Sequence, residues 1–403
     1  MGSGLAIDGF EPVRKKPFPP WPYFWEEEKK AVLEVLDSGK VNYWTGTKCR
    51  EFEKKFAEYL GVKYAVAVNS GTSALHVALA AAGIGAGDEV IVPPLTFIAT
   101  ATSVLQQLAI PVFADVEWET HNLDPDAVRK AITPRTKAII PVHLSGHPAE
   151  MDEIMEIAEE HDLIVIEDCA QAHGAEYKGR KVGTFGHINA FSFCQDKIFT
   201  TGGEGGMVVT NDEEYYRIAR EFALYAGAGG RLGFNYRMTE MQAAIGLVML
   251  ERLDKFVEKR RENARYLTEH LSSLDGIRTP IERPYVKHVY YRYVCTLDLS
   301  KFKVSKDQFI KAVAAEGVPI QPHTTSELYL DPTFQKQLGY GRSQCPFKCP
   351  LYKGKLNYRE NLCPTAQRIG REAFRLLVHP TIEKEDLDDV IAAIKKVYNA
   401  YRK

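Results

Sequence analysis

The chain has 403 residues, of which 45% are hydrophobic and 26% are charged, and its formal net charge is -2. This length exceeds that of an average domain, so we expect a large domain in residues 1–255, including an N-terminal arm, and a small domain in residues 256–403. The near-neutral charge does not indicate nucleic acid or an anionic membrane as a partner. No window has the roughly 20 apolar residues needed to span a bilayer.

Seven cysteines are scattered along the chain, and no secretory signal precedes them. Their odd number and wide spacing favour a reducing, cytoplasmic compartment. Cys345, Cys349 and Cys363 lie close together in sequence, but their spacing does not match a zinc-finger pattern and no fourth ligand is evident. We therefore expect no metal site.

The first half of the chain alternates short apolar segments with segments of helical periodicity. Within residues 151–160, for example, Met151, Ile154, Met155 and Ala158 recur at helical spacing. Strands are predicted at residues 64–68, 89–92, 111–114, 138–142, 163–166, 190–193 and 207–209. This alternation favours an α/β fold with a mainly parallel sheet covered by helices on both faces.

The second half opens with a long amphipathic pattern from Met238 to about Leu271, which predicts one helix leading into the second domain. An alternating strand pattern follows in HVYYRYVCTLDL, and helical patterns follow at residues 305–316 and 384–401. These elements predict a small C-terminal α/β domain. Residues 338–364, rich in Pro and Tyr, are expected to form an extended loop that shapes a substrate pocket.

A candidate anion site follows the first strand. The sequence VKYAVAVNSGTSALHVAL places a Ser70-Gly71-Thr72 turn between an apolar strand and a helix beginning near Ser73. A helix N-terminus presents free N–H groups and a partial positive charge. Gly71, Thr72 and Ser73 are therefore candidates for holding a phosphate, although an ordinary strand-to-helix connection with an N-cap residue explains the same pattern.

A second candidate site residue ends the strand in LIVIEDCAQAHG. Asp168 lies at the carboxyl end of this buried strand, where open α/β sheets bind ligands. A carboxylate in a dry pocket requires a hydrogen-bonded or positive partner, and a protonated pyridine nitrogen is one such partner. The alternatives are an N-cap role for Asp168 and a structural role for His173.

The most informative segment is AFSFCQDKIFTTGGEGGMVVT, residues 190–210. It places Lys197 between an apolar strand and a glycine-rich turn, where backbone without Cβ atoms can approach a ligand closely. This is the setting that a Schiff-base lysine requires. A lysine that also moves protons is favoured by a lowered pKa.

The order of these motifs resembles the DegT/DnrJ/EryC1/StrS family of aminotransferases. Further similar segments are PPLTFIATA at residues 93–101, PVHLSG at 141–146, GFNYRMTEMQAAIGLVMLERLD at 233–254 and LLVHP at 376–380. The resemblance implies the fold-type I architecture of enzymes that use pyridoxal 5'-phosphate (PLP) and mostly act on keto-sugars and keto-cyclitols. Each motif alone is weak, whereas their shared order is specific.

The resemblance also assigns roles to individual residues. Lys197 would form the Schiff base with PLP, and Asp168 would pair with the pyridine nitrogen. Gln171 would face the phenolic oxygen of the ring, and Phe97 would stack on its face. The phosphate would be held by Gly71, Thr72 and Ser192.

Other matched positions imply a second subunit and substrate contacts. Asn235 is similar to a family asparagine that reaches the phosphate from the neighbouring subunit, which implies a homodimer with shared active sites. His143 matches a family histidine near the pocket, as a candidate substrate contact with a structural hydrogen bond as an equal alternative. His323 lies in the C-terminal region where family members place substrate-contacting residues. Arg237 is a candidate contact to a polar substrate, with a structural ion pair as the alternative. Glu204 is expected to be structural.

The implied activity is ping-pong transfer of an amino group from glutamate or glutamine to a nucleotide-linked keto-sugar or to a keto-cyclitol. Two alternatives stay open. Some relatives are dehydratases that carry histidine in place of the lysine, which Lys197 disfavours, and others aromatise their substrate to an aminobenzoate. A PLP-binding protein without turnover is disfavoured because the whole set of site residues is present.

Overall fold

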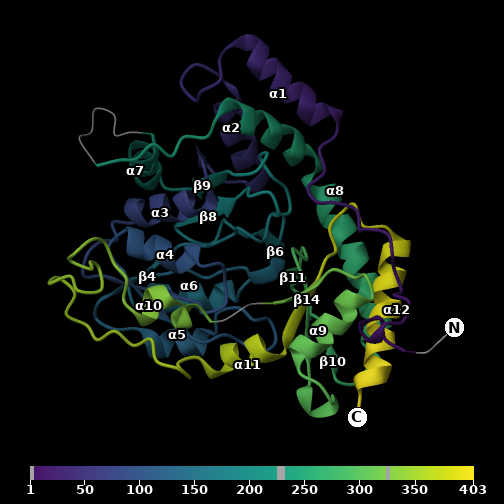
Figure 1. The fold of residues 1–403 in the computed structure, drawn as a ribbon. Helices are drawn as coiled ribbons and strands as arrows, with labels where there is room; N and C mark the ends of the chain where they lie inside the picture. The colour runs from purple at the N-terminus through teal and green to yellow at the C-terminus, as the bar shows by residue number, and fades with distance from the viewer. Residues whose placement is uncertain (1–3, 225–231, 324–326) are drawn as a thin grey trace.

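The computed structural model describes residues 4–224, 232–323 and 327–403 (Figure 1). Its large sheet consists of two groups of strands, in the orders β3-β2-β4-β5 and β1-β9-β8. Parallel bridges from Asp168 to Val142 and to Ala190 join the two groups. The strands are β1 (Tyr64–Val68), β2 (Glu89–Val92), β3 (Ile110–Phe113), β4 (Thr136–Ile139), β5 (Ile164–Val165), β8 (Ile188–Ser192) and β9 (Gly206–Thr210).

Most neighbouring strands of this sheet are parallel, as the alternation of strands and helices predicted. The pairs β2–β3, β2–β4 and β4–β5 are parallel, and only β9 runs antiparallel, to both β1 and β8. The helices of this part are α1 (Glu26–Ser38), α2 (Lys48–Leu60), α3 (Gly71–Ala81), α4 (Ala99–Gln106), α5 (Pro125–Ala131), α6 (Met151–Glu160) and α7 (Glu213–Ala223). Among the described helices, none has the length and apolar character needed to cross a membrane.

Helices cover both faces of the large sheet because its strands are apolar on both sides. In β2, Val90 and Val92 pack in one buried cluster with residues of α3 and α4. Ile91, between them, packs in another cluster with residues of α5 and α6. Successive strand residues point to opposite faces, so a continuous apolar run is the pattern of a doubly covered strand.

A second, antiparallel sheet forms in the C-terminal part, in the strand order β10-β12-β14-β13. It comprises β10 (Ile277–Arg278), β12 (Tyr293–Leu297), β13 (Ile320–Pro322) and β14 (Ala373–Leu376). It packs with α9 (Lys306–Ala315), α12 (Lys384–Tyr401) and the end of α8 (Glu240–Leu271). A small sheet of β6 (Glu176–Tyr177), β7 (Arg180–Lys181) and β11 (Val286–Lys287) links the two parts of the chain.

The predicted division at residue 255 stays a prediction. Helix α8 is continuous through that position, and the N-terminal segment lies beside α12 (Figure 1). Leu5 belongs to the buried cluster of the C-terminal sheet. Arg14 forms ion pairs of 2.7 Å with Asp386 and 2.8 Å with Asp389. The N-terminal arm therefore packs with the C-terminal part.

Residues 338–364 lie between α10 (Pro332–Gln335) and α11 (Pro364–Glu372), along the edge of the large sheet. The Tyr358 hydroxyl donates a 3.0 Å hydrogen bond to the carbonyl of Pro111 in the edge strand β3. The Tyr352 hydroxyl donates a 2.8 Å bond to Glu89 in β2. The segment covers a sheet edge that Pro111 already protects by lacking an N–H group.

Candidate active site

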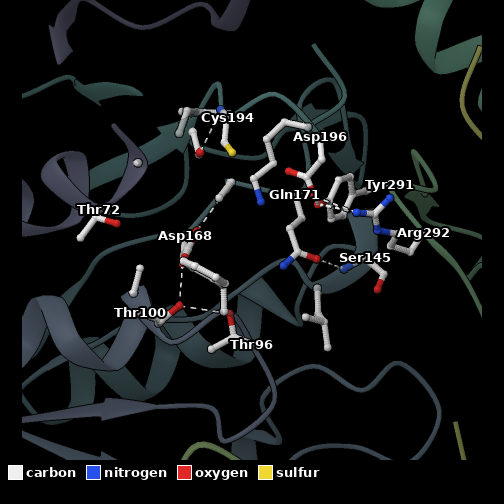
Figure 2. Close-up of a pocket in the computed structure, with 18 of the residues that line it drawn as sticks. Thr72, Thr96, Thr100, Ser145, Asp168, Gln171, Cys194, Asp196, Tyr291 and Arg292 are labelled. Carbon is white, nitrogen blue, oxygen red and sulfur yellow. Dashed lines mark hydrogen bonds and ion pairs between the residues drawn. The ribbon is translucent and has the colours of Figure 1, made fainter. Parts of the chain in front are cut away.

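A cavity of about 1060 Å³ lies between the carboxyl ends of the large-sheet strands and the C-terminal sheet. Figure 2 shows side chains from both parts converging on it. Residues 338–364 were expected to shape a substrate pocket, and none of them lines this cavity of their own chain. Their aromatic side chains are used instead to cover the edge of the large sheet.

Lys197 lines the cavity and is only 9% exposed. The Trp21 indole donates a 2.9 Å hydrogen bond to its carbonyl, and its Nζ lies 4.9 Å from the centre of the Tyr291 ring. Burial acts to lower the pKa of Lys197, but electrostatic interactions with Tyr291, Asp196 and Asp168 outweigh burial and raise the pKa. The side chains around Lys197 therefore do not by themselves give the lowered pKa that was expected for this lysine.

Asp168 is buried at the carboxyl end of β5 and lines the same cavity. Its Oδ2 accepts a 2.8 Å hydrogen bond from the Thr100 hydroxyl, and its Oδ1 accepts one of 3.1 Å from the N–H of Ala170 (Figure 2). Burial raises the pKa of Asp168, and these bonds partly offset the rise. A cationic group in the cavity would stabilise the carboxylate further.

Gln171 is oriented by the backbone of Ser145. The Ser145 N–H donates a 2.8 Å hydrogen bond to Oε1 of Gln171, which leaves the amide nitrogen on the opposite side (Figure 2). Ser145 itself has a φ of 57°, in the left-handed region that a non-glycine residue adopts rarely. This backbone conformation fixes Gln171 with a hydrogen-bond donor available to a ligand.

The predicted phosphate site is built on the N-terminus of α3. Gly71 is the first residue of this helix, and a Cβ there would lie 2.5 Å from the Cβ of Ser192, so only glycine fits. Gly71, Thr72 and Ser192 all line the cavity. The structure thus brings a helix N-terminus and two hydroxyl side chains together, which suits an anion.

Ser73 is the exception among the predicted phosphate ligands. Its N–H donates to the N-cap Ser70 at 3.1 Å, and its hydroxyl donates to Asn69 at 2.7 Å. Ser73 is buried and does not line the cavity. The structure therefore does not bring Ser73 together with the other predicted phosphate ligands, because both of its donors are used to stabilise the helix start.

The remaining predicted residues divide into those that line the cavity and those that do not. Phe97, Glu204 and His323 line it, and Phe97 is 66% exposed. Asn235 is exposed and does not line it. Arg237 does not line it either, and it donates a 3.3 Å hydrogen bond to the carbonyl of Leu224. Residues 229–231, which begin the predicted interface loop, lie outside the described residues.

His143 is fully buried and does not line the cavity. Its Nε2 lies 2.9 Å from Oε2 of Glu167, and its Nδ1 accepts a 3.0 Å hydrogen bond from the N–H of Ala149. Both ring nitrogens therefore have partners within the protein. This arrangement favours the structural alternative for His143.

His323 lines the cavity and has one ring nitrogen that is not hydrogen-bonded within the described part of the chain. Its Nδ1 is buried and has no hydrogen-bond partner among the described residues. Burial, with a smaller contribution from the nearby His121 ring, holds the pKa of His323 well below its usual range. The ring is therefore neutral at physiological pH, which suits a hydrogen bond to a polar substrate.

Several lining residues were missed in the sequence. Asp196 accepts hydrogen bonds of 2.5 Å from the Tyr291 hydroxyl and 2.7 Å from Nη2 of Arg292, and Arg375 lines the same wall. The available signal was an arginine interrupting an apolar strand pattern, in YYRYV and in AFRLLV. Lining residues without such a signal include Thr96, Thr100 and Gln321.

Comparisons with known proteins identify the family of the chain. Residues 22–348 match the DegT/DnrJ/EryC1/StrS aminotransferase family. The chain is 45% identical to the GDP-perosamine synthase of Escherichia coli O157:H7, over 93% of this chain and 96% of that protein. It is 36% identical to the L-glutamine:2-deoxy-scyllo-inosose aminotransferase of Streptomyces kanamyceticus, over 98% of this chain and 97% of that protein.

Solved structures show the same fold at similar coverage. The aminotransferase from Psychrobacter cryohalolentis superimposes with a TM-score of 0.87 at 41% sequence identity, over 95% of this chain and 99% of that one. The α/β fold predicted from the sequence is thus confirmed at the level of the whole chain. By sequence and by fold, the protein belongs to the DegT/DnrJ/EryC1/StrS aminotransferase family.

Proposed function

We propose that this enzyme uses PLP to transfer an amino group from L-glutamate or L-glutamine to a ketone of a nucleotide-linked sugar or a cyclitol. The observation that carries the proposal is one cavity holding a buried lysine, a buried aspartate and a helix N-terminus, in Lys197, Asp168 and Gly71. The names of the two relatives, a GDP-perosamine synthase and a keto-inosose aminotransferase, support the two acceptor classes.

The lining residues fit PLP chemically. The N-terminus of α3, with Thr72 and Ser192, would hold the phosphate, and the Asp168 carboxylate would pair with the pyridine nitrogen. Gln171 would donate its amide hydrogen to the phenolic oxygen, and Phe97 would cover the ring face. When bound, PLP supplies an electron sink for the carbon that loses a proton.

Lys197 is the proposed acid and base of the reaction. Its amine, once free, would take a proton from the donor carbon and return it elsewhere, which requires it to stay within hydrogen-bond reach of the reacting atoms. Tyr291 confines the amine by its ring, and Asp196 holds Tyr291 through a 2.5 Å hydrogen bond. These contacts would keep the amine close to the substrate through both half-reactions.

A shared-site homodimer in the cytoplasm is part of the proposal. Asn235 is exposed outside the cavity of its own chain, so it is available to a second subunit. Trp44, which does not line the cavity, is a large apolar side chain that is 53% exposed, as expected of a surface buried on association. The cysteines are all free thiols, which supports a reducing compartment.

A two-step half-reaction screen tests the activity. The PLP-loaded protein is mixed with L-glutamate, L-glutamine or L-alanine while the visible absorbance of the cofactor is followed. It is then freed of donor and mixed with nucleotide-linked keto-sugars or with keto-inositols. We expect one of the first two donors to bleach the absorbance and one ketone class to restore it. Loss of a keto-sugar without any donor would instead indicate a lyase, and no response to any donor would contradict the proposal.

A further inference from the structure

We propose that Arg292 and Arg375 form a subsite for the α-carboxylate of the amino donor. The inference rests on the proposed function and names the part of the cavity that recognises one of its two substrates. Arg292 directly precedes β12, and Arg375 lies in β14, where it pairs with Val294 of β12 and Gln321 of β13. The C-terminal sheet thus presents two guanidinium groups to the cavity.

Arg292 has an unused donor in a buried position. Its Nη2 donates to Asp196 at 2.7 Å and to the Tyr291 hydroxyl at 3.2 Å. Its Nε is buried and has no hydrogen-bond partner among the described residues. Buried N–H groups are nearly always paired, so an unpaired one lining a cavity indicates that a bound acceptor completes the site.

Arg375 lacks a counter-ion in the described part of the chain. Its Nε and Nη2 both donate to Oε1 of Gln321, at 3.2 Å and 2.7 Å, and this acceptor is neutral. Burial and the positive charge of Arg292 lower the pKa of Arg375. On this wall, two guanidinium groups are therefore balanced by one carboxylate, Asp196. A further anion would relieve their mutual repulsion.

The position of this pair selects the α-carboxylate. Arg292 is bonded to Tyr291, whose ring centre lies 4.9 Å from the Lys197 amine. An α-carboxylate is one bond away from the carbon that carries the amino group, so it must bind close to that amine. The diphosphate of a nucleotide-linked sugar is separated from its ketone by the sugar ring, and a keto-cyclitol has no anionic group. Planar guanidinium groups also match a carboxylate in two-point geometry.

Arg375→Gln tests the subsite, and Arg368→Gln is the matched control. Arg368 lies 3.9 Å above the Trp118 ring and does not line the cavity. The first readout is the calorimetric Kd of 2-oxoglutarate for each protein loaded with PLP. We expect Arg375→Gln to raise this Kd by about 10- to 100-fold, the loss of one or two charge-assisted hydrogen bonds. Arg375→Lys should recover part of the loss, and Arg368→Gln should leave the Kd unchanged.

The second readout compares two isomers, L-glutamine and L-isoglutamine, which exchange the positions of their carboxylate and amide. In the donor half-reaction, the wild type should strongly prefer the isomer with the free α-carboxylate, and Arg375→Gln should remove most of that preference. An equal loss with both isomers would overturn the subsite and leave a structural role. Weaker binding of GDP, UDP or dTDP with an unchanged Kd for 2-oxoglutarate would also overturn it, in favour of the acceptor diphosphate. A wild type that reacts with no amino acid would contradict the proposed function itself.

Discussion

Nε2 of His143 lies 2.9 Å from Oε2 of Glu167, and both side chains are completely buried. Because the Ala149 N–H donates to Nδ1 of His143, the hydrogen of the neutral ring is on Nε2 and is donated to Glu167. Glu167 also accepts 2.7 Å bonds from the N–H groups of Gly183 and Gly186. The pair therefore stabilises the turn before β8 behind the cavity.

His143→Ala is accordingly expected to lower stability more than substrate affinity. The lost hydrogen bond, which leaves the buried Glu167 carboxylate without one of its partners, should reduce the free energy of unfolding by about 1–3 kcal/mol. Urea unfolding of the wild type and the variant measures this difference, and the KM values of both substrates should change less than about threefold. A large rise in KM at unchanged stability would return His143 to the substrate site.

Lys197→Ala is expected to abolish transamination and the visible absorbance of bound PLP without unfolding the protein. Lys197 is the lysine that lines the cavity with Asp168, so no other described lysine is placed to replace it. Far-ultraviolet circular dichroism checks the fold, and borohydride treatment of the PLP-loaded wild type followed by peptide mapping identifies the attached residue. Labelling of a different lysine would show that the assignment is wrong.

Asp168→Ala should lower turnover by about 10²–10³-fold, because a preorganised charge at the reacting group is lost. A variant of Thr100 tests the role of the same carboxylate without removing it. Its hydroxyl donates to Asp168 at 2.8 Å and acts to lower the pKa of Asp168, so Thr100→Val should cost about tenfold in turnover. Thr102→Val is the control, since the Thr102 hydroxyl bonds to the Ile98 carbonyl of its own helix. Equal effects of the two threonine variants would contradict the assignment.

Much of the fold could be predicted because many of its helices and strands have a hydrophobic pattern that is visible within the segment itself. The predicted strands at residues 64–68 and 89–92 and the helices at 151–160 and 384–401 agree with β1, β2, α6 and α12. The strand predicted at residues 163–166 is shorter, because β5 pairs with β4 only over Ile164–Val165. Single Asp168 bridges then continue the sheet, which no local pattern could indicate.

Some residues of the candidate site could likewise be predicted from local motifs, and others could not. Lys197, Asp168 and Gly71 lie in contiguous motifs whose chemistry is visible in the sequence. Arg292, which directly precedes β12, and Arg375 in β14 are more than 80 residues apart, and they meet only through the pairing of β12 with β14. Long-range strand pairing has no local signature, so this wall of the cavity required the structure.

Glu53 gives a pH-dependent prediction away from the active site. It is buried, and burial raises its pKa from 4.5 to about 7, despite hydrogen bonds from the Tyr43 hydroxyl and the N–H of Ala67. The folded protein therefore keeps a proton that the unfolded chain has released, and stability should fall by about 3 kcal/mol as the pH rises from about 4.5 through 7. In urea unfolding between pH 5 and 8, Glu53→Gln should remove most of this fall. The exposed Glu51→Gln, in the same helix, should keep it, and a fall unchanged in Glu53→Gln would contradict the assignment.

The shared active site leads to a complementation test between two inactive proteins. In the proposed dimer, each site combines Lys197 and Asp168 of one chain with Asn235 of the other, related by a two-fold axis. Mixing Lys197→Ala with Asn235→Ala gives mixed dimers in which one of the two sites has every group intact. With equal amounts and free exchange, about a quarter of the wild-type activity should return.

The matched control is a mixture of Lys197→Ala with Asp168→Ala. Both residues line the cavity of one chain, so each site of that mixed dimer lacks one of them and the mixture should stay inactive. Subunit exchange is measured first with fluorescently labelled protein, and Asn235→Ala must be inactive alone. If exchange occurs and the first mixture stays inactive, or if sedimentation shows a fully active monomer, each site is complete within one chain. In that case the exposed Asn235 does not bind the phosphate of the cofactor in a neighbouring subunit.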